Sequence, residues 1–265
     1  MNYELGAIFS DIDVRDYQGV CCVSEDNFPE EFELPIVRIK NQGSVGSCVA
    51  HALSSVIEYF NFIQYNVKDE MSVGYIYGNR ENSTHKGKGM VIRDTLDAVC
   101  KYGDTLYVNF PYNVEIPEAI EKFQNVKDDL HNDAYLNRFS SYYRLNNIND
   151  IKAALTSNNP VVFAITWYND MKVVDGILTT EYKEASGGHC MVIYGWNSQG
   201  WKIQNSWGKK WGNNGTAILP FDFKIKESWA VTDSITDNLT IKKPFSSKIG
   251  KIIAKILNVI LNSLK

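Results

Sequence analysis

Hydrophobic residues recur at every third or fourth position along the chain between residues 49 and 63. This spacing places them on one face of a helix, so it predicts an amphipathic α-helix over this stretch. Later in the chain, short apolar runs bounded by turn residues indicate strands instead. The main strand candidates lie between residues 131 and 235 and are YYRL, VVFAITWY, MVIYGW and WKIQNSW. The pattern therefore predicts a helical first half and a strand-rich second half.

A second amphipathic pattern covers the end of the chain. Residues 248–265 place isoleucine and leucine on one helical face, with lysine and asparagine largely on the other. A helix of this length spans about 27 Å, but Lys251 and Lys255 make it a poor transmembrane segment. Residues 237–265 contain six Lys and one Asp, a net charge of +5 that leaves −9 on the rest of the chain. We expect this helix to dock on its own acidic chain or to self-associate; a membrane surface and a groove on a partner protein are the alternatives.

The composition is that of a soluble globular enzyme. The 265 residues are 44% hydrophobic and 22% charged, which suits a folded core and argues against disorder. The net charge of −4 gives no reason to expect nucleic acid as a partner. Five cysteines are an odd number, and the N-terminus has no signal-like apolar run. We therefore expect a reduced, cytoplasmic protein, with peripheral membrane association as an alternative.

Cys48 stands just after a Gly/Ser turn and at the head of the predicted helix, with the side-chain amide of Gln42 six residues upstream. Acyl transfer by a thiol requires this combination, because a helix N-terminus favours the thiolate and an amide donor can stabilise an oxyanion. An isolated cysteine at such a position is more often a buried structural residue. Further residues are needed to decide between these interpretations.

A base and an orienting group for the thiol occur later in the chain. His189 follows two glycines and opens an apolar strand, and Asn205 follows sixteen residues later. Two strands joined by a turn near residues 197–200 would lay these two side chains side by side. Asn205 could then accept the imidazole N–H, while Trp207 shields that bond from water. Cysteine, histidine and asparagine in this order indicate nucleophilic catalysis by a thiol.

The chain resembles the papain-like cysteine peptidases, in the bacterial or phage type without a long pro-region. The matching motifs are QGSVGSC, GGHCMVIYGW and NSWGKKWGNNG. Weaker similarity joins them, so the resemblance covers roughly residues 34–235. It implies an α+β, two-lobed papain-like fold, with a helical N-terminal lobe, an antiparallel β-rich C-terminal lobe and the active site in the cleft between them.

The resemblance also implies the catalytic roles. Cys48 is the nucleophile, His189 the general base and acid, and Asn205 the residue that orients His189. Gln42 and the Cys48 backbone N–H form the oxyanion hole. The implied reaction is hydrolysis of peptide or protein substrates through a thioester, without a metal or another cofactor. We expect a thiolate–imidazolium pair to be present before substrate binds.

Substrate-binding residues are expected by resemblance along the same cleft. A loop at residues 86–89 borders the cleft and could pair with an extended substrate backbone. A pocket beside the scissile bond would be walled by small or apolar residues, which favours a hydrophobic side chain two positions from that bond. The candidate substrate-binding residues are Gly87, Gly89, Met90, Ala164, Gly187, Gly188 and Trp207.

Some positions depart from the family pattern. Val45 stands where many secreted members carry a disulfide-forming cysteine. His51 lies one helical turn after Cys48, and we favour a buried structural role over a second catalytic one. Cys190 follows the base directly, and strand alternation should turn it to the opposite face. No CxxC pair supports a zinc site.

The sequence divides into four parts: a leader at 1–33, a helical lobe with the catalytic cysteine at 34–130, a β-rich lobe with the catalytic histidine and asparagine at 131–235, and a linker with the cationic helix at 236–265. The leader could pack across the back of the domain or shield the cleft, and packing across the back is the expectation we favour.

Two functions from different classes fit this organisation. The first is a cysteine endopeptidase. The second is a catalytically weak or inactive papain-fold protein whose C-terminal helix engages a membrane or a partner. Inactive relatives usually lose the cysteine, histidine or asparagine, and this chain retains all three. We therefore favour the enzyme; the oligomeric state stays open.

Overall fold

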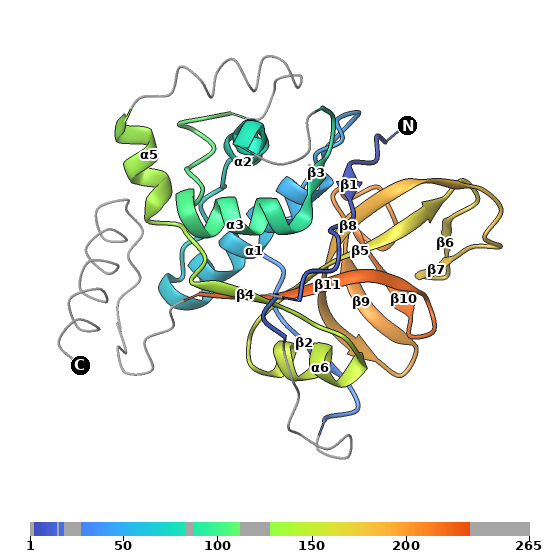
Figure 1. Ribbon diagram of the computed structural model, residues 1–265. Coiled ribbons are helices and arrows are strands. Elements are labelled where there is room, and N and C mark those ends of the chain that lie inside the picture. The colour runs from blue at the N-terminus through green and yellow to red at the C-terminus, as the bar shows by residue number, and fades with distance from the viewer. Residues whose placement is uncertain (1–2, 15, 19–27, 83–86, 112–127, 234–265) are drawn as a thin grey trace.

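The computed structural model describes residues 3–14, 16–18, 28–82, 87–111 and 128–233. Its helices are α1 (Cys48–Tyr65), α2 (Val73–Gly78), the 3-10 turn η2 (Asn79–Asn82), α3 (Ile92–Tyr102), α5 (Asp128–Tyr135) and α6 (Ile148–Thr156). Its strands are β1 (Ala7–Ile8), β2 (Phe32–Glu33), β3 (Met90–Val91), β4 (Ser141–Arg144), β5 (Val161–Tyr168), β6 (Lys172–Val174), β7 (Ile177–Thr179), β8 (Ala185–Asn197), β9 (Gly200–Gln204), β10 (Thr216–Pro220) and β11 (Ile225–Thr232). Helices α1, α2, α3 and α5 gather on one side of the molecule and most of the strands on the other (Figure 1). The α+β architecture expected from the sequence is confirmed.

Helix α1 is the helix that the hydrophobic spacing predicts. It begins at Cys48 and its side chains Leu53, Val56 and Phe60 are buried, since this face packs against α2, α3 and strand β8. It ends at Asn66, whose left-handed φ of 53° turns the backbone N–H onto the carbonyls of the last turn. The helix therefore carries its first residue to strand β8, in the middle of the sheet.

The large sheet has nine strands, of which eight follow the order β4-β11-β5-β8-β9-β10-β7-β6, while β2 pairs with β8. Neighbouring strands are antiparallel except β7 and β10. Strand β11 lies between β4 and β5 although it comes last in the chain. Helix α6 packs on this sheet, contacting β2, β5, β8 and β11 (Figure 1). The core of the protein lies between α1 and the inner face of the sheet.

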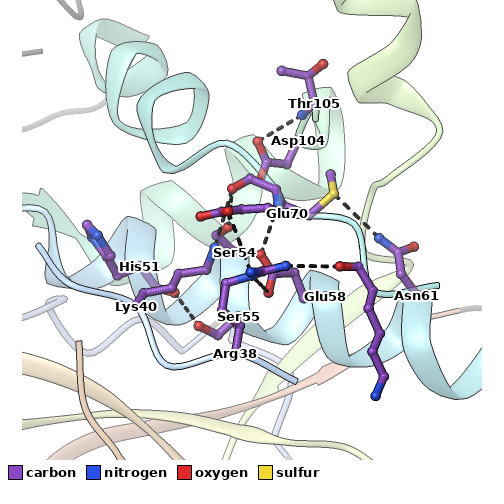
Figure 2. A network of polar contacts seen from close by, with 12 residues as sticks. Arg38, Lys40, His51, Ser54, Ser55, Glu58, Asn61, Glu70, Asp104 and Thr105 are labelled. Atoms are coloured by element: carbon purple, nitrogen blue, oxygen red, sulfur yellow. Dashed lines mark hydrogen bonds and ion pairs between the residues drawn. The ribbon is translucent and has the colours of Figure 1, made fainter. Parts of the chain in front are cut away.

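A buried ion network ties α1 to the segment before it. Lys40 donates to Glu58 on α1 at 2.6 Å, and both side chains are at most 4% exposed. Arg38 and the backbone N–H of Met71 also donate to Glu58, at 3.3 Å and 2.9 Å (Figure 2). Buried charges need such pairing, because an isolated one costs several kcal/mol in desolvation. The network holds the chain two residues before Gln42 against the helix that begins at Cys48.

Two predicted segments, the cationic helix and the leader, have different outcomes in the structure. The cationic helix at 248–265 lies outside the described residues. Strand β2, at the end of the predicted leader, pairs with β8. The boundaries of the four parts stay predictions. Among the described residues, no helix has both the length and the apolar character required to cross a membrane.

Candidate active site

Cys48 is the first residue of α1 and its side chain is fully buried. Its thiol lies within reach of the backbone N–H groups of Cys190, Gly6 and Val49. Cys190 is the residue after His189 on β8, and α1 contacts β8 directly. The fold therefore brings the thiol of α1 and the imidazole of β8 to the same place.

His189 and Asn205 meet across the β8–β9 hairpin. The register pairs Val192 with Gln204, so Asn205 comes just beyond the end of β9 and beside His189. His189 Nε2 lies 2.8 Å from Asn205 Oδ1, and this amide oxygen also accepts the Ser206 backbone N–H at 2.7 Å. With Nε2–H donating to Asn205, the buried Nδ1 carries the lone pair, and none of the residues that the structure describes forms a hydrogen bond with it. This tautomer is the one that can accept a proton from a thiol.

Two tryptophans enclose the imidazole of His189. Trp207 stacks on it with ring centroids 4.5 Å apart and an interplanar angle of 28°. Trp167 meets it edge-on at 5.3 Å and also contacts Trp207 at 4.6 Å. The shielding expected of Trp207 is thus supplemented by Trp167, which the sequence motifs do not identify. In the sequence, Trp167 is marked only by its place in the predicted strand VVFAITWY.

The side-chain amide of Gln42 points toward Cys48's end of the helix and is held in one orientation. Gln42 Oε1 accepts the hydroxyl of Ser206 at 2.7 Å, so the amide nitrogen faces the opposite way. Nε2 donates to the carbonyl oxygens of Val45 at 2.9 Å and Glu4 at 2.8 Å. Ser206 was not among the predicted site residues, although it lies in the NSW motif.

The leader runs directly through this site. Tyr3 stacks on Trp207 with centroids 4.5 Å apart and donates its hydroxyl to the Trp207 carbonyl at 3.1 Å. Further along, Met90 N–H donates to the Gly6 carbonyl at 2.8 Å, and strand β1 pairs in parallel with β3. Strand β1 also contacts β8, so it lies between β3 and the sheet (Figure 1).

Our favoured expectation that the leader packs across the back of the domain is therefore wrong for residues 3–8, which shield the site instead, whereas Asp16 packs on Arg93 and Arg144 and strand β2 pairs with β8. The physical reason is close backbone contact that glycine alone permits. A Cβ added at Gly6 would lie 1.9 Å from the Gly46 carbonyl oxygen, and one added at Gly188 would lie 2.1 Å from that of Ala7. These small residues leave room for an extended chain next to Cys48.

The leader is not bound as a substrate awaiting cleavage. The leader group that contacts the thiol is the N–H of Gly6, which acts as a donor. The preceding carbonyl, that of Leu5, points its oxygen toward Gly46, whereas Gln42 is occupied by the carbonyl of Glu4. The described leader thus presents the N–H of one residue to the thiol and the carbonyl of another to the Gln42 amide, whereas acyl transfer requires one carbonyl in contact with both.

The protonation states follow from this enclosure. Burial raises the pKa of the Cys48 thiol to about 11, although backbone N–H groups oppose the shift. Burial lowers the pKa of His189 to about 4, although the bond to Asn205 opposes that shift. Both groups are therefore neutral at pH 7. Burial in this closed form therefore favours the neutral thiol and imidazole over the expected thiolate–imidazolium pair, because a buried charge loses its solvation.

The structure brings most predicted substrate-binding residues to the leader. Gly89, Gly187 and Gly188 would each contact leader atoms if they carried a Cβ, and their neighbours Met90 and Trp207 contact it directly. Gly89 also has a positive φ of 88°, which favours glycine there.

The other two predicted residues lie differently. Ala164 is fully buried in β5, opposite Cys190 on β8. Gly87 is exposed, and its carbonyl accepts a hydrogen bond from Arg80 at 3.2 Å. Their part in substrate binding stays a prediction.

His51 is placed as a buried, hydrogen-bonded side chain. Its Nδ1 lies 2.9 Å from the Ser47 carbonyl oxygen, and burial lowers its pKa to about 3. Cys190 is buried beside the thiol of Cys48 and is a free cysteine. In the part of the chain that the structure describes, no group of three or more metal-binding side chains comes together.

Comparison with known proteins agrees with this geometry. The family model of the papain family cysteine proteases matches residues 29–227. A peptidase C1-like protein of Acanthamoeba polyphaga mimivirus is 29% identical over 230 residues, which cover 75% of this chain and 71% of the viral protein. A cysteine protease of Blomia tropicalis is also 29% identical, over 71% of this chain and 59% of its own length.

Solved structures show the same fold. Xylellain, a cysteine protease from Xylella fastidiosa, superimposes with a TM-score of 0.76 at 24% identity, covering 87% of this chain and 96% of that one. ProCathepsin B S9 from Trypanosoma congolense gives a TM-score of 0.68 at 20% identity, over 87% and 86% of the two chains. The family expected from the three motifs is thus confirmed, and the chain belongs to the papain family of cysteine proteases.

Proposed function

We propose that the protein is a cysteine endopeptidase that cleaves peptide bonds through a thioester on Cys48. The observation that carries this proposal is the 2.8 Å contact between His189 Nε2 and Asn205 Oδ1. It fixes the imidazole with its free Nδ1 lone pair in the region of the thiol. A histidine held for structural reasons alone gains nothing from leaving a buried ring nitrogen without a partner, since that costs desolvation energy.

The reaction uses these groups in sequence. His189 Nδ1 accepts the Cys48 proton as the sulfur attacks the substrate carbonyl carbon, and the carbonyl oxygen becomes an oxyanion. Gln42 Nε2 and the Cys48 backbone N–H stabilise this charge. The imidazolium then protonates the leaving amine as the peptide bond breaks, which leaves a thioester. Water, deprotonated by His189, hydrolyses the thioester and returns the thiol.

The closed arrangement represents a latent form of this enzyme. The leader occupies the donors that the reaction needs, because Gln42 binds Glu4 and the thiol faces the Gly6 N–H. Residues 3–8 must leave this position before a substrate can bind. Their departure also readmits water to Cys48 and His189, so that the ion pair expected of an active thiol peptidase can form.

Covalent labelling tests the proposal. The full chain and a Gly6→Val variant, whose side chain has no room beside Gly46, would each be exposed to an epoxysuccinyl inhibitor of papain-like enzymes. Intact mass should show one adduct on Gly6→Val, little on the unchanged chain, and none on Gly6→Val with Cys48→Ala. Absence of an adduct and of peptide hydrolysis in Gly6→Val would favour the inactive, binding-protein alternative.

A further inference from the structure

A large hollow lies at one end of the site, next to the residues that enclose His189. Its volume is about 800 Å³, and its lining includes the leader residues Tyr3 and Leu5. Its aromatic wall is made by Trp167, Trp207 and Trp211. Strand β6 and the loop after β9 also line the hollow, and they lie close together, since a Cβ at Gly212 would lie 3.7 Å from Val173. The hollow therefore stays open to solvent while the leader is in its closed position.

Its position identifies the half of a substrate that would reach it. The leader crosses the site from Tyr3, which stacks on Trp207, to Ala7, which pairs with Met90 on β3. The half of the substrate that forms the thioester is expected to pair near β3. The half that leaves as an amine must then extend the other way, over Trp207 and into the hollow. At about 3.3 Å for each extended residue, the first three residues after the scissile bond lie within it.

The charges that line the hollow are unequal. Lys172 on β6 and Lys210 on the loop after β9 both line the hollow, and both are exposed. Asp175 is the single carboxylate of the lining. Among the described residues, none of the three forms an ion pair. Two ammonium groups and one carboxylate leave a net positive charge in a chain whose overall charge is −4.

The remaining polar groups of the lining do not neutralise these lysines. Asn169 and Ser186 bond to each other, and Asn169 also donates to Glu184 at 2.9 Å. The indole rings beside the lysines lower the local dielectric, which strengthens an ion pair relative to one in open water. The hollow thus offers a negatively charged side chain both apolar contact and uncompensated positive charge.

We propose that Lys172 and Lys210 select substrates with a glutamate or aspartate among the first three residues after the scissile bond. This rests on the proposed peptidase function and specifies its substrate class. The hydrophobic side chain expected two positions from the scissile bond is a separate preference. Its pocket would lie beside Met90, at the other end of leader residues 3–8 from the hollow.

Matched peptides test this in the full-length Gly6→Val protein. Internally quenched peptides would differ only in carrying Glu, Gln or Lys at each of the three positions. At low salt, kcat/KM should be about two- to fivefold higher for Glu than for Gln at one or more positions. The preference should shrink as salt is added, because the lysines are exposed. Equal rates for the Glu and Gln peptides at every position would overturn the proposal.

Charge reversal locates the effect. In the Gly6→Val background, the Lys172→Glu, Lys210→Glu double variant should cleave the Lys peptides faster than the Glu peptides, which reverses the preference seen with both lysines present. Lys209→Glu with Lys224→Glu is the matched control, since it changes the net charge equally and neither residue lines the hollow. Reversal in the control as well would show a long-range charge effect and overturn the assignment. If the Gly6→Val protein with both lysines intact fails to cleave even the Gln peptides, the proposed peptidase function itself is rejected.

Discussion

Gln42 Nε2 donates a hydrogen bond of 2.8 Å to the carbonyl oxygen of Glu4. These two residues are far apart in the sequence, and their contact couples the leader to the proposed oxyanion hole. The amide that would stabilise the reaction is satisfied by the chain's own backbone, so its desolvation costs little in the closed form. The leader and a substrate therefore compete for the same donor.

Gly6→Val should open the site. The valine side chain cannot fit beside Gly46, where even a Cβ would approach to 1.9 Å, so the leader must leave its position. We expect peptidase activity and inhibitor labelling to rise at least tenfold, measured with a fluorogenic peptide. Val14→Phe serves as the control, because Val14 in the same leader is 98% exposed and extra bulk there meets solvent. Equal activation by both variants would contradict a steric mechanism.

Asp16 should act as the anchor of the leader. Its carboxylate bonds to Arg93 at 2.6 Å and 2.8 Å and lies 3.4 Å from Arg144, and its side chain is 5% exposed. Asp16→Asn removes the negative charge that faces the two guanidinium groups, which weakens leader docking by about 1–3 kcal/mol.

Faster inhibitor labelling of Asp16→Asn would show this weakening. Asp11→Asn is the matched control, because Asp11 engages Arg93 only through its backbone carbonyl. Unchanged labelling of Asp16→Asn would mean that contacts of residues 3–8 alone hold the leader.

The pH dependence of thiol reactivity should differ between the closed and open forms. Burial raises the pKa of Cys48 to about 11, and only the thiolate reacts. Iodoacetamide labelling of Cys48 in the unchanged chain should therefore climb about tenfold per pH unit up to about pH 11. In Gly6→Val, where water reaches the thiol, the rate should level off several units lower. Superimposable profiles, with Cys48 adducts quantified by peptide mass, would exclude an effect of leader burial on the thiol.

The buried pair of Lys40 and Glu58 should be essential for stability. Lys40→Met leaves the Glu58 carboxylate almost fully buried without its main partner, which should lower the free energy of unfolding by about 3–5 kcal/mol in a denaturant titration. The control is Lys202→Met, since Lys202 contacts Glu33 at a similar 2.7 Å but with the carboxylate 55% exposed. That change should cost less than about 1 kcal/mol. Similar losses for the two variants would show that burial does not set the cost.

Local patterns in the sequence determined several elements of this protein. The spacing of apolar residues predicted α1, because helical periodicity depends on neighbouring residues only. The turn at 197–200 brought His189 to Asn205, since a hairpin sets its register over a short distance. The three motifs identified the family, and the family implies the fold.

Tertiary structure decided the rest. The contact of Gly6 with Gly46 and the occupation of Gln42 by Glu4 depend on how separate segments pack, and no local periodicity records that. The thiol of Cys48 is neutral for the same reason. Its sequence environment favours the thiolate, but the leader removes solvent from it, and desolvation outweighs the backbone donors around the sulfur. The sequence alone therefore determined which groups meet, and packing determined that the leader covers them.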